Sequence, residues 1–106
     1  MVKHIILWQL KEMCEEEKER RIAQVKAGLE GLRGKIPGMT EIRVITEKLS
    51  TSNVDMMLDS TFETQDALDG YSVHPEHVFV AETYIRPYIA TRLCMGYEVE
   101  AQEILL

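Results

Sequence analysis

The side chains best suited to acid–base chemistry are three histidines and one tyrosine, namely His4, Tyr71, His74 and His77. A histidine with its ordinary pKa is mostly neutral at neutral pH, so it can take up a proton, and a buried tyrosine hydroxyl can donate a hydrogen bond. Tyr71 and His77 lie on either side of the dipeptide His74-Pro75. We expect them to meet in a pocket between helices and a sheet, where one could move a proton and the other hold an oxygen atom.

The segment His74-Pro75-Glu76-His77 also contains atoms that can bind metals. Pro75 disfavours helical geometry at His74 and fits best in a first helical turn, so the two histidines need not share one face of a helix. No third ligand is evident nearby in the sequence, and zinc sites normally use three or four protein ligands. We therefore expect no metal here, and we expect His74 to cap or support the start of a helix.

His4 belongs to an alternating pattern that predicts a strand over residues 2–11. The first face of this strand carries Val2, His4, Ile6, Trp8 and Leu10, and the second has Ile5 and Leu7 at its centre. A strand that is apolar on both faces must be covered on both faces. His4 is then at least half buried, either as a hydrogen-bonded core histidine or as part of a functional site.

The remaining elements follow from hydrophobic spacing and from turn residues. An apolar stripe at steps of three and four predicts a helix over 15–35, which Pro37-Gly38 ends. Strands are predicted over 40–49, 54–62 and 92–99, a short helix after Thr64, and a further helix from Pro75 to about Ile89. The order β-α-β-β-α-α-β predicts an α+β fold, with a four-stranded antiparallel sheet that has its helices on one face. A second copy of the chain is the simplest cover for the other face, so we expect a homodimer.

Length and composition indicate one ordinary globular domain. The chain has 106 residues, which we assign to a single domain, 1–106, with a core of 2–99 and a short C-terminal tail, 100–106, loosely held or tucked against a partner. The formal net charge is −6 and no cluster of Lys and Arg offsets it, so we expect no nucleic-acid partner. No segment approaches the roughly 18 apolar residues that a membrane span needs, and the N-terminus lacks a signal-peptide pattern. Cys14 and Cys94 have no metal-type spacing, and we expect a cytoplasmic protein with reduced cysteines.

Four residues are candidates to line a ligand pocket: Trp8, Met56, Ala81 and Tyr84. Ala81 and Tyr84 fall at helical spacing from His77 and are predicted to project to the same side. Aromatic and methionine residues in such patterns are most often core, and methionine in particular fills irregular gaps. The same residues would also suit a pocket for a hydrophobic ligand.

Several segments resemble the stress-responsive A/B-barrel (Dabb) family, from Val2 to about Val99. They are the opening VKHIILWQLK, the helix end GKIPGM, the segment FETQDALDGYSVHPEHVFV and the final strand. The most specific element is Tyr71 followed by His74-Pro75-Glu76-His77, combined with Lys3-His4 near the N-terminus. The resemblance implies a ferredoxin-like subunit that pairs as a dimeric α/β barrel, with two sheets facing each other and the helices outside. Some relatives also hold a cation in the loop that corresponds to residues 33–39, through backbone carbonyls, which every sequence supplies.

The best understood relatives in that family are plant polyketide cyclases. They close linear poly-β-keto chains by an intramolecular aldol condensation, without a metal or an organic cofactor. Their pocket residues correspond by type and motif position to His4, Tyr71 and His77. The resemblance thus implies His77 as the base, Tyr71 as its orienter or proton donor, and His4 as a supporting donor. Trp8 and the pair Met56-Met57 depart from the plant enzymes, which leaves the pocket size and the substrate open.

Three classes of function remain. The first, which we favour, is a small binding or stress-associated homodimer without turnover, whose pocket would be narrow and filled by Trp8 and methionine side chains. The second is a cofactor-independent, cyclase-like enzyme, which requires a continuous cavity that reaches His77 and Tyr71. The third is a monooxygenase-type member of the wider superfamily, for which no specific motif is visible. For the first two we expect a hydrophobic or carbonyl-containing small molecule as the ligand. The fold alone does not choose among the three classes, because function depends on the site.

Overall fold

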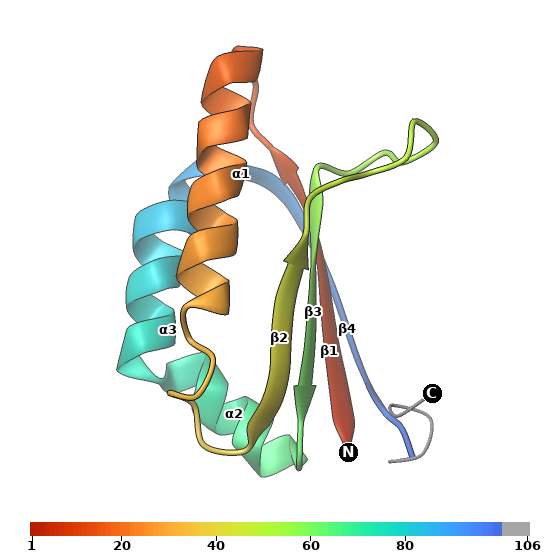
Figure 1. Cartoon of the computed structure of the whole chain (residues 1–106), viewed down its shortest axis with the longest axis vertical. Coiled ribbons are helices and arrows are strands. Elements are labelled where there is room, and N and C mark those ends of the chain that lie inside the picture. The colour runs from red at the N-terminus through yellow and green to blue at the C-terminus, as the bar shows by residue number, and fades with distance from the viewer. Residues whose placement is uncertain (101–106) are drawn as a thin grey trace.

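Four antiparallel strands form one sheet, and all the helices lie on the same face of it (Figure 1). The computed structural model describes residues 1–100. Its strands are β1 (Val2–Leu10), β2 (Met39–Ile45), β3 (Met56–Phe62) and β4 (Ile89–Glu98), in the spatial order β2-β3-β1-β4. Its helices are α1 (Glu15–Glu30), α2 (Gln65–Val73) and α3 (Pro75–Val80). The predicted α+β class and the β-α-β-β-α-α-β order are confirmed, whereas the tail predicted for 100–106 lies almost wholly outside the described residues.

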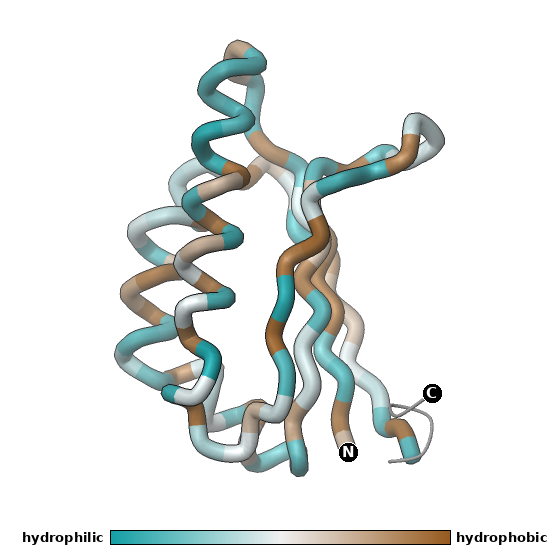
Figure 2. Tube along the Cα trace, in the orientation of Figure 1, coloured by the Kyte–Doolittle hydropathy of each residue, from teal (hydrophilic) through white to brown (hydrophobic). Residues whose placement is uncertain are grey.

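The first strand, β1, runs through the middle of the sheet between β3 and β4. The predicted core face is confirmed, because Val2, Ile6, Trp8 and Leu10 are all buried beneath the helices. Residues on the opposite face of the strand are only half-buried within the single chain. Figure 2 shows the alternation of hydrophobic and hydrophilic residues most clearly along β2. Such alternation places one row of side chains toward the helices and the next row toward the open face.

Helix α1 is shorter than the stripe of apolar residues predicted. It ends at Glu30, not at residue 35, and the chain continues through tight turns. The C-cap, Gly31, keeps right-handed angles, and within the turns that follow Gly34 adopts φ of 82°, a left-handed conformation that favours glycine. The predicted stripe still faces the core. Leu29 is buried on the helix, and Leu32 and Ile36 are buried although they lie in the turns that follow it.

The helix predicted from Pro75 to about Ile89 is divided into three parts. Helix α3 covers Pro75–Val80, a π-helical turn follows over Ala81–Ile85, and a 3-10 turn covers Arg86–Tyr88. Pro87 explains the end of the helical segment: Arg86 still has right-handed helical angles, but proline has no N–H to donate to a helical hydrogen bond. The last strand therefore begins at Ile89, earlier than the predicted residue 92.

The loop between β2 and β3 is also longer than predicted. Strand β2 ends at Ile45, not at residue 49, and β3 starts at Met56, not at residue 54. Asp55 holds the end of this loop, because its carboxylate accepts a hydrogen bond of 2.8 Å from the backbone N–H of Leu10. Lys48 reaches the other carboxylate oxygen at 3.1 Å. Burial would raise the pKa of Asp55, but these two partners outweigh it and hold the pKa below its usual value.

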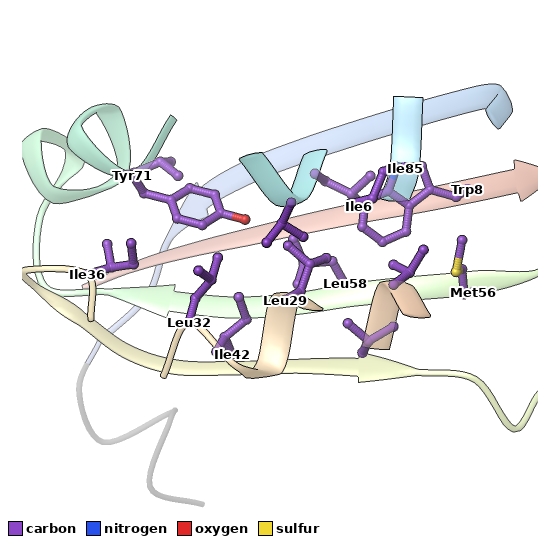
Figure 3. Close-up of a cluster of buried hydrophobic side chains, with 14 of the residues drawn as sticks. Ile6, Trp8, Leu29, Leu32, Ile36, Ile42, Met56, Leu58, Tyr71 and Ile85 are labelled. Atoms are coloured by element: carbon purple, nitrogen blue, oxygen red, sulfur yellow. The ribbon is translucent and has the colours of Figure 1, made fainter. Parts of the chain in front are cut away.

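The core fills the space between the helix layer and the sheet. Figure 3 shows side chains from α1, α2 and the strands pointing into one layer, with Trp8 and Met56 at one end and Tyr71 at the other. This layer also contains Leu29, Ile42 and Leu58, which are almost completely buried. The residues of this layer are therefore buried within a single chain.

The other face of the sheet has no helix over it (Figure 1), and it carries an apolar patch. We call this the open-face patch, and it consists of Ile5, Leu7, Leu93, Met95 and Tyr97. Its members on β4 are 58 %, 67 % and 46 % exposed in chain order. They stand beside β1 in register, since Leu7 pairs with Leu93 and Ile5 pairs with Met95.

The part of the open face over β3 is polar and charged, but its side chains are largely buried. Asp59 is only 8 % exposed and Thr61 is fully buried. Lys3 covers both by hydrogen bonds, and the Arg43 guanidinium lies 3.0 Å from the Asp59 carboxylate. Burial would raise the pKa of Asp59, but the hydrogen bonds from Lys3 and Arg43 lower it below its usual value.

Among residues 1–100, no helix is long and apolar enough to cross a membrane.

Candidate functional site

A cavity of about 290 Å³ lies between the helix layer and the sheet. This volume is at the small end of the range for ligand pockets. Its walls are mostly apolar and include Ile6, Trp8, Leu29, Leu58, Ala81 and Ile85. Its polar side chains come from four different elements: Tyr71, His77, Arg86 and Arg92. An apolar space with a few converging polar groups is the usual form of a small-molecule site.

Tyr71 and His77 meet in this cavity, as the sequence predicted. Their ring centroids are 4.0 Å apart and the rings are inclined at 35°. Tyr71 is the last but two residue of α2, and His77 lies in the first turn of α3. The short connection at His74 therefore brings side chains from two helices face to face.

Two capping interactions fix the starts of these two helices. The Thr64 hydroxyl accepts a hydrogen bond of 3.1 Å from the Ala67 N–H and starts α2. His74 Nδ1 accepts a hydrogen bond of 3.2 Å from the Glu76 N–H and starts α3, and Pro75 occupies the first helical position. The predicted capping role of His74 is confirmed, and a histidine used in this way is directed to the backbone of its own helix.

Both polar groups at the face-to-face contact lack a partner within residues 1–100. The Tyr71 hydroxyl is buried and makes no hydrogen bond, and it points along the core toward Ile6 (Figure 3). The Nδ1 atom of His77 is also buried without a hydrogen bond. Buried polar groups are normally satisfied, so this pair is unusual for a region that only holds the fold together.

Burial decides the protonation of both groups. It lowers the pKa of His77, and the charges of Arg86 and Arg92 lower it further. The backbone of Ser72 raises the pKa in the opposite direction, although its contact with His77 does not have hydrogen-bond geometry. Burial raises the pKa of Tyr71 well above its usual value. At neutral pH the pair is thus a neutral imidazole and a protonated phenol, which can accept and donate a proton respectively.

His4 lies next to this pair but does not line the cavity. Its ring centroid is 6.2 Å from that of Tyr71, edge to face, and its Nδ1 atom is 3.7 Å from the Cys94 sulfur. Burial lowers the pKa of His4, and the charges of Arg92 and His77 contribute to the same direction. His4 is therefore a neutral neighbour of Tyr71, on the sheet side.

The comparisons with known proteins give the family. The family model described as the stress responsive A/B barrel domain (Dabb) matches residues 2–99. The chain belongs to this family. No curated protein matches the sequence.

Solved structures agree with this assignment of the Dabb domain. A dimeric protein of unknown function with a ferredoxin-like fold from Bacteroides fragilis is 30 % identical, with a TM-score of 0.86 over 92 % of this chain and 95 % of that chain. A hydroxynitrile lyase from Passiflora edulis is 17 % identical, with a TM-score of 0.68 over 94 % of both chains. A putative antibiotic biosynthesis monooxygenase from Nitrosomonas europaea is 11 % identical, with a TM-score of 0.73 over 93 % and 98 %. The last two show a shared fold only.

Of the four residues predicted to line the pocket of this Dabb domain, Trp8 and Ala81 do so. Met56 is buried beside Trp8, its partner in the sheet register, and packs in the core at the end of the layer (Figure 3). Tyr84 faces α1 and lines an outer groove with Gly28. The wide π-helical turn changes the spacing assumed for a regular helix, so Ile85 faces the cavity and Tyr84 does not.

Two polar residues of the cavity, Arg86 and Arg92, were not predicted from the sequence. Arg92 stands opposite Trp8 in the register of β1 and β4, on the side of the sheet that faces the helices. Alternation along the last strand contains the signal, because Arg92 has the opposite phase to Leu93 and Met95. A charged residue on the helix-facing side of a strand is the feature that could have identified it.

The two histidines of the possible metal site, His74 and His77, turn to different partners. His74 caps α3 and His77 turns to Tyr71, so the two side chains have separate surroundings. Across residues 1–100, no three side chains of His, Cys, Asp or Glu gather where they could hold a metal ion.

Proposed function

We propose that this Dabb protein acts as a homodimer and binds one small, mostly apolar molecule with a carbonyl oxygen in the cavity of each subunit. The observation that carries this proposal is the cavity itself, which reaches Tyr71 and His77. A pocket filled by Trp8 and methionine side chains would leave no such space. With about 30 Å³ for a molecule the size of water, a volume of about 290 Å³ has room for on the order of ten non-hydrogen atoms.

The Tyr71 hydroxyl supports a ligand that carries an oxygen acceptor. It is a donor without a partner among residues 1–100, and it stays protonated because burial raises its pKa. Trp8, Leu58 and Ile85 would contact the apolar part of the ligand. Burial of that part would supply most of the binding free energy, at roughly 25 cal/mol for each Å² removed from water.

The open-face patch supports the homodimer. Leu93, Met95 and Tyr97 are large, exposed and adjacent to Ile5 and Leu7. Contiguous apolar surface of this kind usually marks an interface, and a two-fold dimer covers the same patch on both subunits at once. The Bacteroides fragilis relative is itself described as dimeric.

A binding test can use the protein's own fluorescence. Trp8 is the single tryptophan and lines the cavity, so ligand entry should change its emission. We expect saturable changes on titration with small ketones such as acetophenone or 2-heptanone. The substitution Ala81→Leu should fill the cavity and abolish them, whereas Ala23→Leu, on the exposed side of α1, should not. Equal binding by Ala81→Leu and the wild type would show that the cavity is not the site.

A second candidate function is turnover by proton transfer next to a carbonyl group, of the cyclase or lyase type. The contact between neutral His77 and protonated Tyr71 favours it. In such a reaction His77 would remove a proton from the carbon beside the carbonyl, and Tyr71 would donate to the oxygen as it gains negative charge. His4 would support Tyr71 from the sheet side. The third class, a monooxygenase, has support only from a shared fold.

Exchange of α-protons tests turnover without knowledge of the natural substrate. In D₂O, the methyl protons of acetophenone should be replaced faster with protein than without it, as followed by NMR. His77→Gln and Tyr71→Phe should each slow the exchange, by roughly 10²-fold or more if these groups act as base and donor. Tyr84→Phe is the matched control, because Tyr84 lies outside the cavity. Ketone binding without exchange would support the binding function and eliminate turnover of this type.

A further inference from the structure

We infer that the ligand carries a carboxylate, and that Arg92 is the residue that selects it. The inference deepens the proposed binding function and rests on it. It begins from the position of Arg92, which lines the cavity and is also exposed. A side chain with both properties lies where the cavity opens to solvent.

The sheet register fixes this position. Arg92 pairs with Trp8, and both point to the helix side of the sheet. Strand alternation then places Leu93 on the open face, away from the cavity. A second copy that covers the open-face patch would therefore leave Arg92 on the cavity side.

The charge of Arg92 has no protein partner in the described part of the chain. The second guanidinium of the cavity, that of Arg86, is 3.3 Å from the Glu82 carboxylate. Arg92 makes no ion pair and no hydrogen bond with residues 1–100. No Asp or Glu of that range lines the cavity. The cavity therefore holds one positive charge that is not compensated locally.

Neighbouring groups respond to this charge. Burial is the largest cause of the lowered pKa of His4 and His77, and the charge of Arg92 adds to it. The same charge partly opposes the raised pKa of Tyr71. The guanidinium charge thus acts on all three residues of the candidate site. A ligand anion bound to Arg92 would be held close to Tyr71 and His77.

The net charge of −6 does not prevent anion binding here. Charges separated by more than about 8 Å are largely screened at physiological ionic strength, so distant carboxylates have little effect at the cavity. A contact with Arg92 is much shorter than this screening length. One uncompensated cation next to apolar walls matches a ligand with a single negative charge and an apolar body.

A carboxylate fits this chemistry better than other anions. The planar guanidinium can donate two parallel hydrogen bonds to the two oxygens of one carboxylate. The volume of about 290 Å³ limits the rest of the ligand to a short chain or a single ring. The ligand class is therefore a small apolar monocarboxylate, with its charged end at Arg92 and its apolar body against Trp8.

Matched acids and amides test the inference. The probes are benzoate, phenylacetate and hexanoate at pH 7, each compared with its own amide, with Trp8 fluorescence as the readout. The wild type should bind at least one acid more tightly than its amide, by about tenfold or more, because hydrogen bonds to charged groups are the stronger ones. Arg92→Gln should remove this preference and leave amide binding within about twofold of the wild type.

Two further variants assign the effect. Arg20→Gln makes the same chemical change on the exposed surface of α1 and should keep the preference. Arg86→Gln should lose much less than Arg92→Gln, since Arg86 is already paired with Glu82. An equal loss in Arg86→Gln would overturn the assignment to Arg92.

The outcomes separate this inference from the function on which it rests. If acids and amides bind the wild type equally well, the carboxylate inference is wrong and the binding function stands. If neither acids, amides nor ketones bind, the proposed function itself fails and the inference fails with it. A preference for acids that Arg92→Gln retains would overturn the role of Arg92 alone.

Discussion

Replacing Leu93 by aspartate should separate the proposed dimer and leave the subunit folded. Leu93 is 58 % exposed in the single chain, so a carboxylate there stays hydrated and should change the free energy of unfolding by about 1 kcal/mol or less. In a two-fold dimer of open faces, the same position is buried once from each subunit. An unpaired buried charge costs roughly 3 to 5 kcal/mol, and two of them cost roughly 6 to 10 kcal/mol per dimer. Because 1.4 kcal/mol is a factor of ten, the dissociation constant should rise about ten-thousand-fold or more.

Native mass spectrometry and sedimentation equilibrium at micromolar concentration measure this change directly. We expect a dimer for the wild type and a folded monomer for Leu93→Asp, with circular dichroism as the check on folding. Phe79→Asp is the matched control, because Phe79 is 60 % exposed but lies on α3, in the helix layer. A Leu93→Asp protein that stays dimeric would refute the open-face dimer. Dissociation of Phe79→Asp in its place would move the interface to the helices.

Three further predictions concern stability. Tyr71→Phe should leave the free energy of unfolding unchanged or raise it by about 1 kcal/mol, because it removes a buried hydroxyl that no residue of 1–100 satisfies; Tyr84→Phe is the control in the same urea titration. Gly38→Ala should destabilise the fold by roughly 1 to 3 kcal/mol, since Gly38 has φ of 78° and an added Cβ would lie 2.5 Å from a side chain of α2. Gly34 has φ of 82° and no atom within 4 Å of an added Cβ, so Gly34→Ala should lower the free energy of unfolding less, through backbone strain alone. The pKa of His77 is lower in the folded state than in the unfolded chain, so the unfolded state binds the proton first as the pH falls. Stability should therefore fall from pH 7.5 to 5.5, and His77→Gln should flatten part of that decrease.

The fold could be predicted because its main signals are local. The two faces of β1 follow from alternation, and the buried set Val2, Ile6, Trp8 and Leu10 is the one that the pattern indicated. Element ends were less accurate, because they depend on backbone conformation and not on hydrophobicity. Helix α1 ends at Glu30 although its C-cap, Gly31, keeps right-handed angles, and the left-handed conformation comes only at Gly34. Many glycines in helices keep helical geometry, so sequence alone does not show which of them ends the helix.

The candidate site was predicted in part. The contact between Tyr71 and His77 could be predicted, because the helix junction at His74-Pro75 that brings them together is visible in the sequence. Tyr84 was assigned to the wrong surface, since a π-helical turn changes the phase of every later residue and has no clear sequence signal. Arg92 was missed because the last strand was read only for its apolar residues. Its role depends on a partner strand, and only the register with Trp8 places it at the cavity.

The pattern of satisfied and unsatisfied groups explains why the cavity, and not another region, is the candidate site. Asp55 and Asp59 are buried carboxylates, and each is held by at least two partners. Arg21 has one buried nitrogen without a hydrogen bond, but its guanidinium lies over the Tyr88 ring at 3.8 Å and its other nitrogens are bonded. The two remaining buried side-chain atoms of residues 1–100 without a partner belong to Tyr71 and His77, whose rings are in contact. Sequences that fold well satisfy their buried polar groups, and the exceptions concentrate at functional sites. A ligand oxygen beside Tyr71 would remove that exception, which is why the cavity is the part of this molecule where binding should raise both stability and order.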